Sequence, residues 1–257
     1  MPGWRSSIRR HGMSEISLRL WLEQHGVLLS IVWDPMDRQR FLLGLGLTLG
    51  LSVASIGLSL ILGVFGAAGL GSRRPLWRGI SSAYVALFRN TPLLVQLFFF
   101  YFGVGALLPL VDGVRLLNGT QWAIIVIGLH NGAFQAQNLR AGIDAVPHST
   151  LQAAAALGMQ GRTVLLHIVL PLALRNSLPA MGNTVVQTIK STSIAYAIAV
   201  PELLYASNRI WSDNFNVAEM MQVLLLVWLL LIGVSSWLLR RLEARLRLPG
   251  QELPDAA

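Results

Sequence analysis

The stretch from Phe41 to Leu70 limits what this chain can fold into more than any other, because it contains no charged residue. A helix needs about 20 apolar residues to cross the hydrocarbon core of a bilayer. The composition agrees: 54% of the residues are hydrophobic and 12% are charged, whereas soluble domains carry about 25% charged residues. The mean hydropathy is +0.58. The sequence therefore predicts an integral membrane protein whose first clear transmembrane helix lies at residues 41–70.

Four more segments are predicted to span the membrane, which makes five. They run from about Ile80 to Leu108, Gln121 to Asn138, Asn176 to Val200 and Val217 to Leu239. Residues 109–120 read as a turn and residues 201–216 as a polar loop. One side of the first span carries only small residues, which suits close helix packing in a bilayer; they are Gly44, Gly46, Gly50, Ser52, Ser55, Gly57, Ser59 and Gly63.

Arginine accounts for most of the net charge of +8, and its distribution among the loops predicts the orientation. Cytoplasmic loops of membrane proteins carry an excess of Lys and Arg. One side holds most of the loop arginines, and we expect it to be cytoplasmic: Arg73, Arg74, Arg78, Arg140, Arg162, Arg175, Arg240, Arg241, Arg245 and Arg247. Arg115 and Arg209 fall on the other side.

The two ends of the chain are less membrane-like. Five spans place the tail 1–40 outside, which conflicts with its own arginines unless an extra membrane-surface or re-entrant helix holds it. Residues 16–33 read either as an amphipathic helix on the membrane surface or as a partly ordered tail. Residues 251–257 form a short C-terminal tail.

The segment from Pro147 to Pro179 is too amphipathic to cross a bilayer. Residues 153–157 favour a helix, Gly158 and Gly161 interrupt it, and an apolar piece at 164–170 is predicted to stop at Pro171. The pattern predicts a short helix, a sharp glycine turn and a second short helix. Its small alanines would allow another protein to approach closely, so we interpret the segment as a docking element.

This segment resembles the EAA loop of ATP-binding-cassette (ABC) importer permeases, which has EAA, a glycine a few residues later, and then I-x-LP. Here Gln152 stands in place of the glutamate, and residues 168–171 read IVLP. In that family the loop at 147–171 would face the cytoplasm and its short helix would sit in a groove of the ATPase subunit. The resemblance implies a coupling role for Gln152, Ala153, Ala154, Leu157, Gly158 and Arg162.

A second resemblance lies in the second span, where FRNTPLLVQ is similar to the RGTPLLVQ signature of polar amino-acid permeases of the histidine, glutamine and glutamate type. Asn90 replaces the usual glycine, and Pro92 is predicted to open the helix. Polar residues inside spans are functional by default. For Arg89 the alternative is that it only reaches toward the cytoplasmic interface.

The third span places Asn131, Gln135 and Asn138 on one helix face. Each buried amide without a partner would cost about 1–3 kcal/mol, so these amides must meet one another, water or a ligand. The surrounding sequence resembles the family pattern GAYxxExxRxGI, with Gln137 at the glutamate. The alternative is that the amides join helix to helix.

The fourth span carries KSTSIAYAIAVPELL, which resembles the family pattern KDTSLAxxIxxxEL. Lys190 is the only lysine in the chain, and Ser191 replaces the aspartate. A structural partner at a carbonyl or a helix end is the alternative role for Lys190. The residues predicted to line a substrate path are Asn90, Thr91, Gln96, Asn131, Gln135, Gln137, Asn138, Thr188, Lys190, Ser191 and Thr192.

The sequence contains no motif for nucleotide binding or metal binding. The chain has no cysteine and no GxxxxGK[ST] phosphate loop, so ATP and Mg²⁺ would bind in a separate ATPase subunit and no cofactor is expected in this chain. No metal-ligand cluster is evident, and His130, His148 and His167 are isolated. We interpret His130 as a packing or pore residue rather than a catalyst.

Together these patterns predict an all-α protein with the five core helices of the type I ABC importer permease (MetI-like) fold across residues 41–250, plus an N-terminal amphipathic segment. By resemblance it is one half of a translocation path in the bacterial inner membrane and is not an enzyme. Its expected partners are an ABC ATPase dimer, a second identical or related permease subunit, an extracytoplasmic solute-binding protein, lipid and an amino acid, but no nucleic acid.

Gln137, Gln152 and Ser191 stand where the family has acidic residues; Gln152 lies in the docking loop, but the other two could line the path. The loss of these carboxylates, with Lys190 and Arg89 retained, favours a neutral polar or acidic amino acid over a cationic one. The alternatives are an importer of another small solute, such as an opine or osmolyte, and an ATP-independent secondary transporter or channel. An intramembrane enzyme would need a nucleophile and a base at credible spacing, and none is seen.

Overall fold

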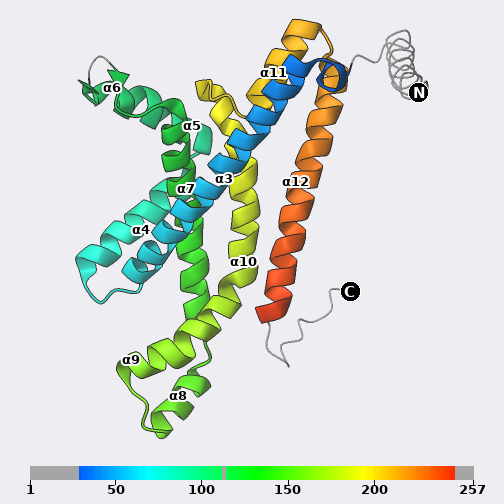
Figure 1. Cartoon of the computed structure of the whole chain (residues 1–257). Helices are drawn as coiled ribbons and strands as arrows, with labels where there is room; N and C mark the ends of the chain where they lie inside the picture. Colours follow the sequence, from blue (N-terminus) through cyan, green and yellow to red (C-terminus); the bar gives the residue numbers. More distant parts are fainter. Residues whose placement is uncertain (1–28, 112–113, 247–257) are drawn as a thin grey trace, which may run out of the picture. The chain divides into compact units, whose positions relative to one another are not determined.

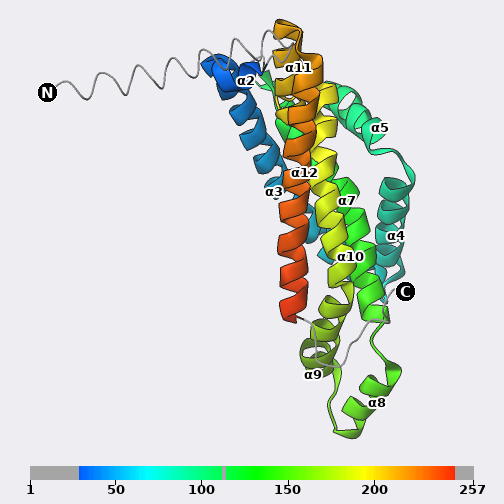
Figure 2. The ribbon, with the colours of Figure 1, turned by 90° about the vertical axis from the view of Figure 1, so that its right-hand side faces the viewer.

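The computed structural model describes residues 29–111 and 114–246, and within them the chain is almost entirely helical. Figures 1 and 2 show the elements, which fall into two compact units. Of the described residues, 29–47 and 201–229 belong to the first unit, and 48–111, 114–200 and 230–246 belong to the second. The predicted surface helix or tail at 16–33 lies largely outside the described residues.

The first unit contains α2 (Ser30–Trp33), the beginning of α3 (Pro35–Leu70), α11 (Leu203–Asn214) and the beginning of α12 (Val217–Leu246). Its apolar core comprises Phe41, Leu203, Ile210, Met220 and Leu224. Helices α3 and α11 approach closely at Gly44, where an added Cβ would lie 2.6 Å from the Cβ of Ala206. The close helix packing predicted for the small residues of the first span is therefore confirmed at Gly44.

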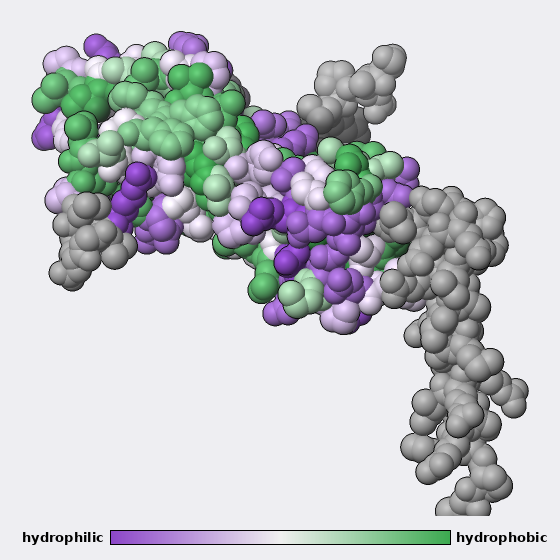
Figure 3. All heavy atoms as spheres, turned by 90° about the horizontal axis from the view of Figure 1, so that it is seen from above, coloured by the Kyte–Doolittle hydropathy of each residue, from purple (hydrophilic) through white to green (hydrophobic). Residues whose placement is uncertain are grey.

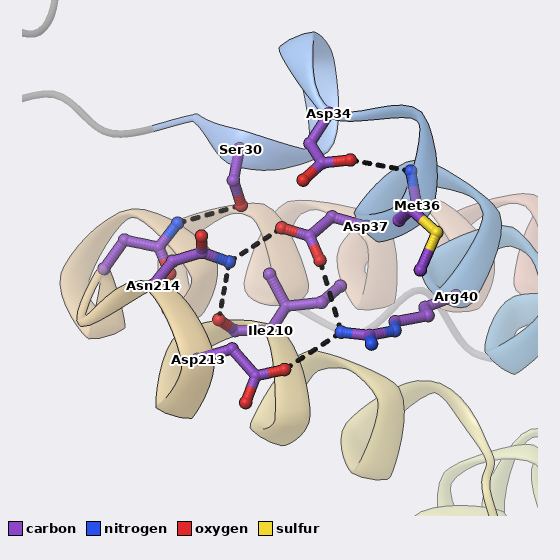
Figure 4. Close-up of polar contacts among 9 residues, drawn as sticks. Ser30, Asp34, Met36, Asp37, Arg40, Ile210, Asp213 and Asn214 are labelled. Carbon is purple, nitrogen blue, oxygen red and sulfur yellow. Dashed lines mark hydrogen bonds and ion pairs between the residues drawn. The ribbon is translucent and has the colours of Figure 1, made fainter.

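A polar cluster at the edge of the first unit joins α3 to α11 (Figure 4). Asn214 donates through Nδ2 to the buried carboxylate of Asp37 at 2.7 Å and to the carbonyl of Ile210 at 3.0 Å. Arg40 lies 2.9 Å from Asp213 and 3.6 Å from Asp37. The burial of Asp37 is therefore compensated by an amide and a guanidinium, as a buried carboxylate requires.

The prediction of a polar loop at 201–216 is wrong, because residues 203–214 form helix α11. Glu202 begins this helix: its carboxylate is fully buried and accepts hydrogen bonds from the backbone N–H of Leu204 and of Tyr205. A side-chain oxygen at this position satisfies N–H groups that have no partner inside the helix. The helix is amphipathic rather than apolar, which explains why its polar residues resembled a loop.

The second unit contains the rest of α3, α4 (Pro75–Asn90), α5 (Leu93–Phe98), the π-helix η1 (Phe99–Val104) and α6 (Gly105–Leu107). A two-stranded antiparallel hairpin, β1 (Leu110–Val111) and β2 (Val114–Arg115), occupies the predicted turn. Then come α7 (Gly119–Asp144), α8 (His148–Ala156), α9 (Gly161–Val164), the π-helix η2 (Leu165–Val169), α10 (Leu170–Ser191) and the 3₁₀ helix η3 (Thr192–Ile198). Within this unit, Figures 1 and 2 show α8 and α9 beyond the ends of α7 and α10.

Packing within the second unit depends on close contact between α3 and α7. A Cβ added to Gly63 would lie 2.5 Å from the Cβ of Gln135, and one added to Gly128 would lie 2.6 Å from a methyl carbon of Leu58. Real Cβ atoms do not approach so closely, so the two helix backbones meet only because these residues are glycine. The prediction of a small packing side on the first span is confirmed at Gly63, but Gly46, Gly50 and Gly57 are exposed and an added Cβ there would meet no described atom within 4 Å.

In the described residues, three helical stretches are long and apolar enough to span a membrane: 35–70, 161–198 and 217–245. The pair 75–90 and 93–107 makes a fourth if it is one bent span. Helix α7 corresponds to the predicted third span but is not among them, because its histidine and amides lower its hydropathy. The all-α membrane fold with its predicted helical segments is confirmed.

The prediction that a helix stops at Pro171 is wrong. Residues 161–198 form one helical stretch of 38 residues, and Pro171 falls in the first turn of α10, directly after η2. A proline inside a helical stretch cannot donate to the carbonyl four residues earlier, and here the stretch is π-helical immediately before the proline, where the hydrogen-bond pattern differs from that of an α-helix. The stretch is about 55 Å long at the rise of an α-helix, so it exceeds the ~30 Å hydrocarbon core.

The surface of the second unit is strongly apolar around α5, η1 and α6. Figure 3 shows hydrophobic residues gathered there, and Phe99, Phe102 and Leu107 are all more than half exposed. A membrane protein can present such residues to lipid acyl chains, which are as apolar as the side chains themselves.

Candidate functional site

The predicted break in the second span is confirmed, with a bend of 110° between α4 and α5. Thr91 and Pro92 lie at the break. Pro92 has no N–H to donate to the carbonyl of Phe88, four residues earlier. Nε2 of Gln96 donates to that carbonyl instead, at 2.9 Å, and to Oγ1 of Thr91 at 2.6 Å. Gln96 thus replaces the hydrogen bond that proline removes.

The same glutamine connects the break to α7. Its Oε1 lies 3.1 Å from Nδ1 of His130, and Gln96 is buried. Both polar atoms of its side chain therefore contact the protein. The prediction placed Thr91 and Gln96 on a substrate path; the structure gives both a structural task at the break, and their contact with a solute stays a prediction.

We expect Gln96→Leu to lower the free energy of unfolding by about 1–3 kcal/mol, because the buried carbonyl of Phe88 and Nδ1 of His130 each lose a hydrogen bond to Gln96. Pro92→Ala restores an N–H at position 92 and should reduce the cost of Gln96→Leu in the double variant. The thermal midpoints of the four proteins of this double-mutant cycle, measured in detergent, check the prediction. Additive effects of the two substitutions would show that Gln96 does not compensate for Pro92.

Arg89, at the end of α4, forms a second group of contacts with α7. Its Nη1 donates to Oε1 of Gln137, and its Cζ lies 5.0 Å from the centre of the Phe134 ring. Both partners are neutral. Arg140, one turn beyond Gln137, instead pairs with the carboxylate of Asp144 at 2.5 Å.

The amides of α7 bind α10. Nε2 of Gln135 donates to the carbonyl of Met181 at 3.3 Å, and Nδ2 of Asn138 donates to the carbonyl of Ala180 at 3.1 Å and to Oγ1 of Thr184 at 2.9 Å. These bonds correspond to the alternative in which amides join helices. Asn131 is buried and donates to the carbonyl of Ile127 within its own helix.

Two amide oxygens on this face of α7 have no hydrogen-bond partner in the described residues: Oδ1 of Asn131 and Oε1 of Gln135. Both side chains are almost fully buried. Their role on a substrate path stays a prediction.

The predicted residues at the end of α10 fall into two groups. Thr188, Ser191 and Thr192 are buried, and each hydroxyl donates to a carbonyl in the preceding turn. Lys190 is exposed, and in the described part of the chain its ammonium group makes no polar contact. Asn90 is likewise exposed beside the break. The structure thus brings Thr91 with Gln96, and Asn138 with Thr184, but it joins neither Asn90 nor Lys190 to them.

Sequence reasoning missed two contacts of this site. His130 was treated as isolated, yet it is bonded to Gln96 across 34 positions of sequence. Phe134 has no part in the predictions from the sequence, yet it lies against the guanidinium of Arg89. The spacing of His130 and Phe134 at i and i+4 placed them on one face of α7, but nothing in the sequence indicated which residues of α4 and α5 that face would meet.

The turn after α8 depends on Gly158, whose backbone conformation ends the helix. Gly158 has φ of +74°, in the left-handed region. Its N–H donates to the carbonyl of Ala155, and the N–H of Met159 donates to the carbonyl of Ala154. This pair of bonds is the Schellman motif, in which glycine adopts the left-handed conformation that ends a helix. The predicted helix and glycine turn are confirmed.

Most of the predicted coupling residues face outward. Leu157 is 80% exposed, and Gln152, Ala153, Gly158 and Arg162 are also exposed. Ala154 is buried within the chain. The exposure of these residues leaves them accessible to a partner, and their coupling role stays a prediction.

The described residues thus form a multi-pass helical protein with a broken second span and an exposed helical turn between α7 and α10. The family described as "Binding-protein-dependent transport system inner membrane component" matches residues 42–248. The chain belongs to this family, and the predictions of an importer permease family and of a multi-pass inner-membrane protein are confirmed.

Individual proteins similar to this chain are also transport permeases. The chain is 30% identical over 221 residues to a glutamine transport system permease protein of Escherichia coli, covering 85% of this chain and 97% of the relative. It is 33% identical to a histidine/lysine/arginine/ornithine transport system permease protein of Salmonella typhimurium, covering 84% and 92%. The crystal structure of an amino acid ABC transporter with histidines superposes with a TM-score of 0.76 at 26% identity, covering 85% of this chain and 100% of that one.

Proposed function

We propose that this chain is the permease subunit of an ATP-driven, binding-protein-dependent importer of amino acids and forms half of the translocation path. The observation that carries the proposal is the continuity between the exposed Arg162 and the span α10. Residues 161–198 form one helical stretch, so a displacement at Arg162 reaches the buried face of Thr184, Thr188 and Ser191 within a single helix, while residues 157–160 join that helix to α8.

The proposed partners supply what this chain lacks. An ABC ATPase dimer, with ATP and Mg²⁺, binds the surface of Leu157 and Arg162 and hydrolyses ATP, so this chain does no covalent chemistry. A second permease subunit, identical or related, provides the other half of the path, and an extracytoplasmic solute-binding protein delivers the solute. The arginine-rich loops lie in the cytoplasm, where the ATPase is.

The transport cycle is alternating access. ATP binding brings the ATPase subunits together and moves α8, the continuous helix transmits this motion, and the path opens outward; hydrolysis resets it. The substrate path uses the exposed Asn90 and Lys190 and the polar face of α7 and α10. Lys190 has no counter-charge among the described residues, which favours a solute with a carboxylate and no excess positive charge.

Copurification of this chain with its cognate ATPase tests the proposal. We expect a stable complex whose ATP hydrolysis rises when the solute-binding protein is added with its amino acid. In uptake assays, unlabelled glutamine or glutamate should compete more strongly than arginine. A chain that purifies alone and moves solute without ATP would support the secondary-transporter alternative, and strong competition by arginine alone would contradict the solute preference.

A further inference from the structure

A cavity of about 470 Å³ lies between α4 and α7 and extends to the end of α3. Protein sites for small ligands usually measure about 300–1,000 Å³. Its polar lining comes from Ser82, Arg89 and Asn90 on α4 and from Gln137 and Arg140 on α7. Leu70, Val85 and Ala86 make the apolar part of the wall.

The charge of this cavity is positive and only partly compensated. No aspartate or glutamate is among its lining residues. Arg140 is matched by Asp144 through two hydrogen bonds, at 3.1 and 2.5 Å. Arg89 contacts only the neutral Gln137 and the ring of Phe134. One guanidinium therefore faces the cavity without a carboxylate among the described residues.

The other polar groups of the lining can donate to the same ligand. Asn90 and Ser82 are exposed and make no side-chain hydrogen bond in the described part of the chain. An amide, a hydroxyl and the remaining N–H groups of a guanidinium together suit a planar or tetrahedral oxyanion, which arginine binds through two parallel bonds.

The guanidinium of Arg89 is exposed rather than enclosed by the chain, so it is open to a ligand, and a charge at membrane depth requires a counter-charge or water. The neutral side chain at position 137 keeps the guanidinium of Arg89 available, because a carboxylate there would pair with it. We propose that the cavity of Ser82, Arg89, Asn90, Gln137 and Arg140 is an oxyanion-binding site for a carboxylate or phosphate group. The oxyanion comes either from the α-carboxylate of an amino acid or from the phosphate of a phospholipid, and only the first source rests on the proposed function.

The test uses the full chain purified alone in a neutral detergent, so that it does not depend on an ATPase. The probes are L-glutamine, L-glutamate and L-arginine, measured by equilibrium binding, and phosphatidylglycerol, measured by native mass spectrometry. We expect at least one probe to bind and its affinity to fall at least tenfold in both Arg89→Gln and Gln137→Glu. Gln137→Glu keeps every arginine but gives Arg89 an internal partner.

Arg78→Gln is the matched control, because it removes an exposed arginine of α4 that is not part of the cavity. It should bind every probe as the wild type does. Melting curves establish that each variant is folded. Amino-acid binding lost in both cavity variants identifies a solute site, and phosphatidylglycerol binding lost in both identifies a lipid site. The absence of binding by all probes, or equal binding by the wild type and both cavity variants, would overturn the proposal.

Discussion

Gly158→Val is expected to uncouple this permease from its ATPase. The left-handed conformation at φ of +74° costs a residue with a Cβ about 1–2 kcal/mol, and a β-branched residue is a genuine outlier there. The Schellman bonds that fix the direction of the chain after α8 would be lost, and with them the position of Leu157. We expect the solute-stimulated ATPase rate to fall at least about tenfold, since ~1.4 kcal/mol is tenfold in an equilibrium.

Gly158→Asn is the matched control for this substitution, because asparagine adopts the left-handed conformation more readily than other residues with a Cβ. It should retain most of the stimulation. An added Cβ meets no atom within 4 Å at this position, so steric overlap does not contribute in either variant. Equal loss in both variants would show that the conformation of Gly158 is not what positions the coupling surface.

Gly63→Leu should prevent the second unit from folding stably. Its Cβ would lie 2.5 Å from the Cβ of Gln135 and 3.3 Å from a backbone carbon of the same residue, so α3 would have to move away from α7. Overpacking of this kind costs about 1–3 kcal/mol and occasionally more. We expect a lower yield of monodisperse protein and a lower thermal midpoint.

The first span offers a control for that effect in Gly57→Leu. An added Cβ at Gly57 meets nothing within 4 Å, although both glycines lie in the same apolar helix. This variant should purify and melt like the wild type. Similar destabilisation by both substitutions would show that helix propensity or membrane insertion, rather than contact with α7, limits stability.

The sequence was informative where a local rule decides the structure. The uncharged stretch 41–70 predicted most of α3, Pro92 predicted the break of the second span, and Gly158 predicted the end of α8. Each depends on one residue type or on local hydropathy. The prediction of a loop at residues 201–216 was wrong because only the polarity of the segment was considered. An amphipathic helix also carries many polar residues, and the first N–H groups of this one are bonded by Glu202.

Other features depend on contacts that are distant in sequence. Pro171 lies inside a continuous helical stretch, directly after the π-helix η2, and local propensity does not indicate that arrangement. The amides of α7 could be placed on one face by their spacing, but their bonds to Ala180, Met181 and Thr184 required the position of α10. The pairing of Gln96 with His130 depends on the 110° bend at Pro92, whose size no sequence rule gives.

The most direct test of the account is uptake of a labelled amino acid into proteoliposomes that contain this chain with its ATPase, in the presence of the solute-binding protein. We expect uptake against a gradient only when ATP, Mg²⁺ and the binding protein are all present, and we expect its loss in Gly158→Val. Uptake that persists without ATP, or that follows an ion gradient instead, would contradict the claim that this chain is an ATP-driven importer permease.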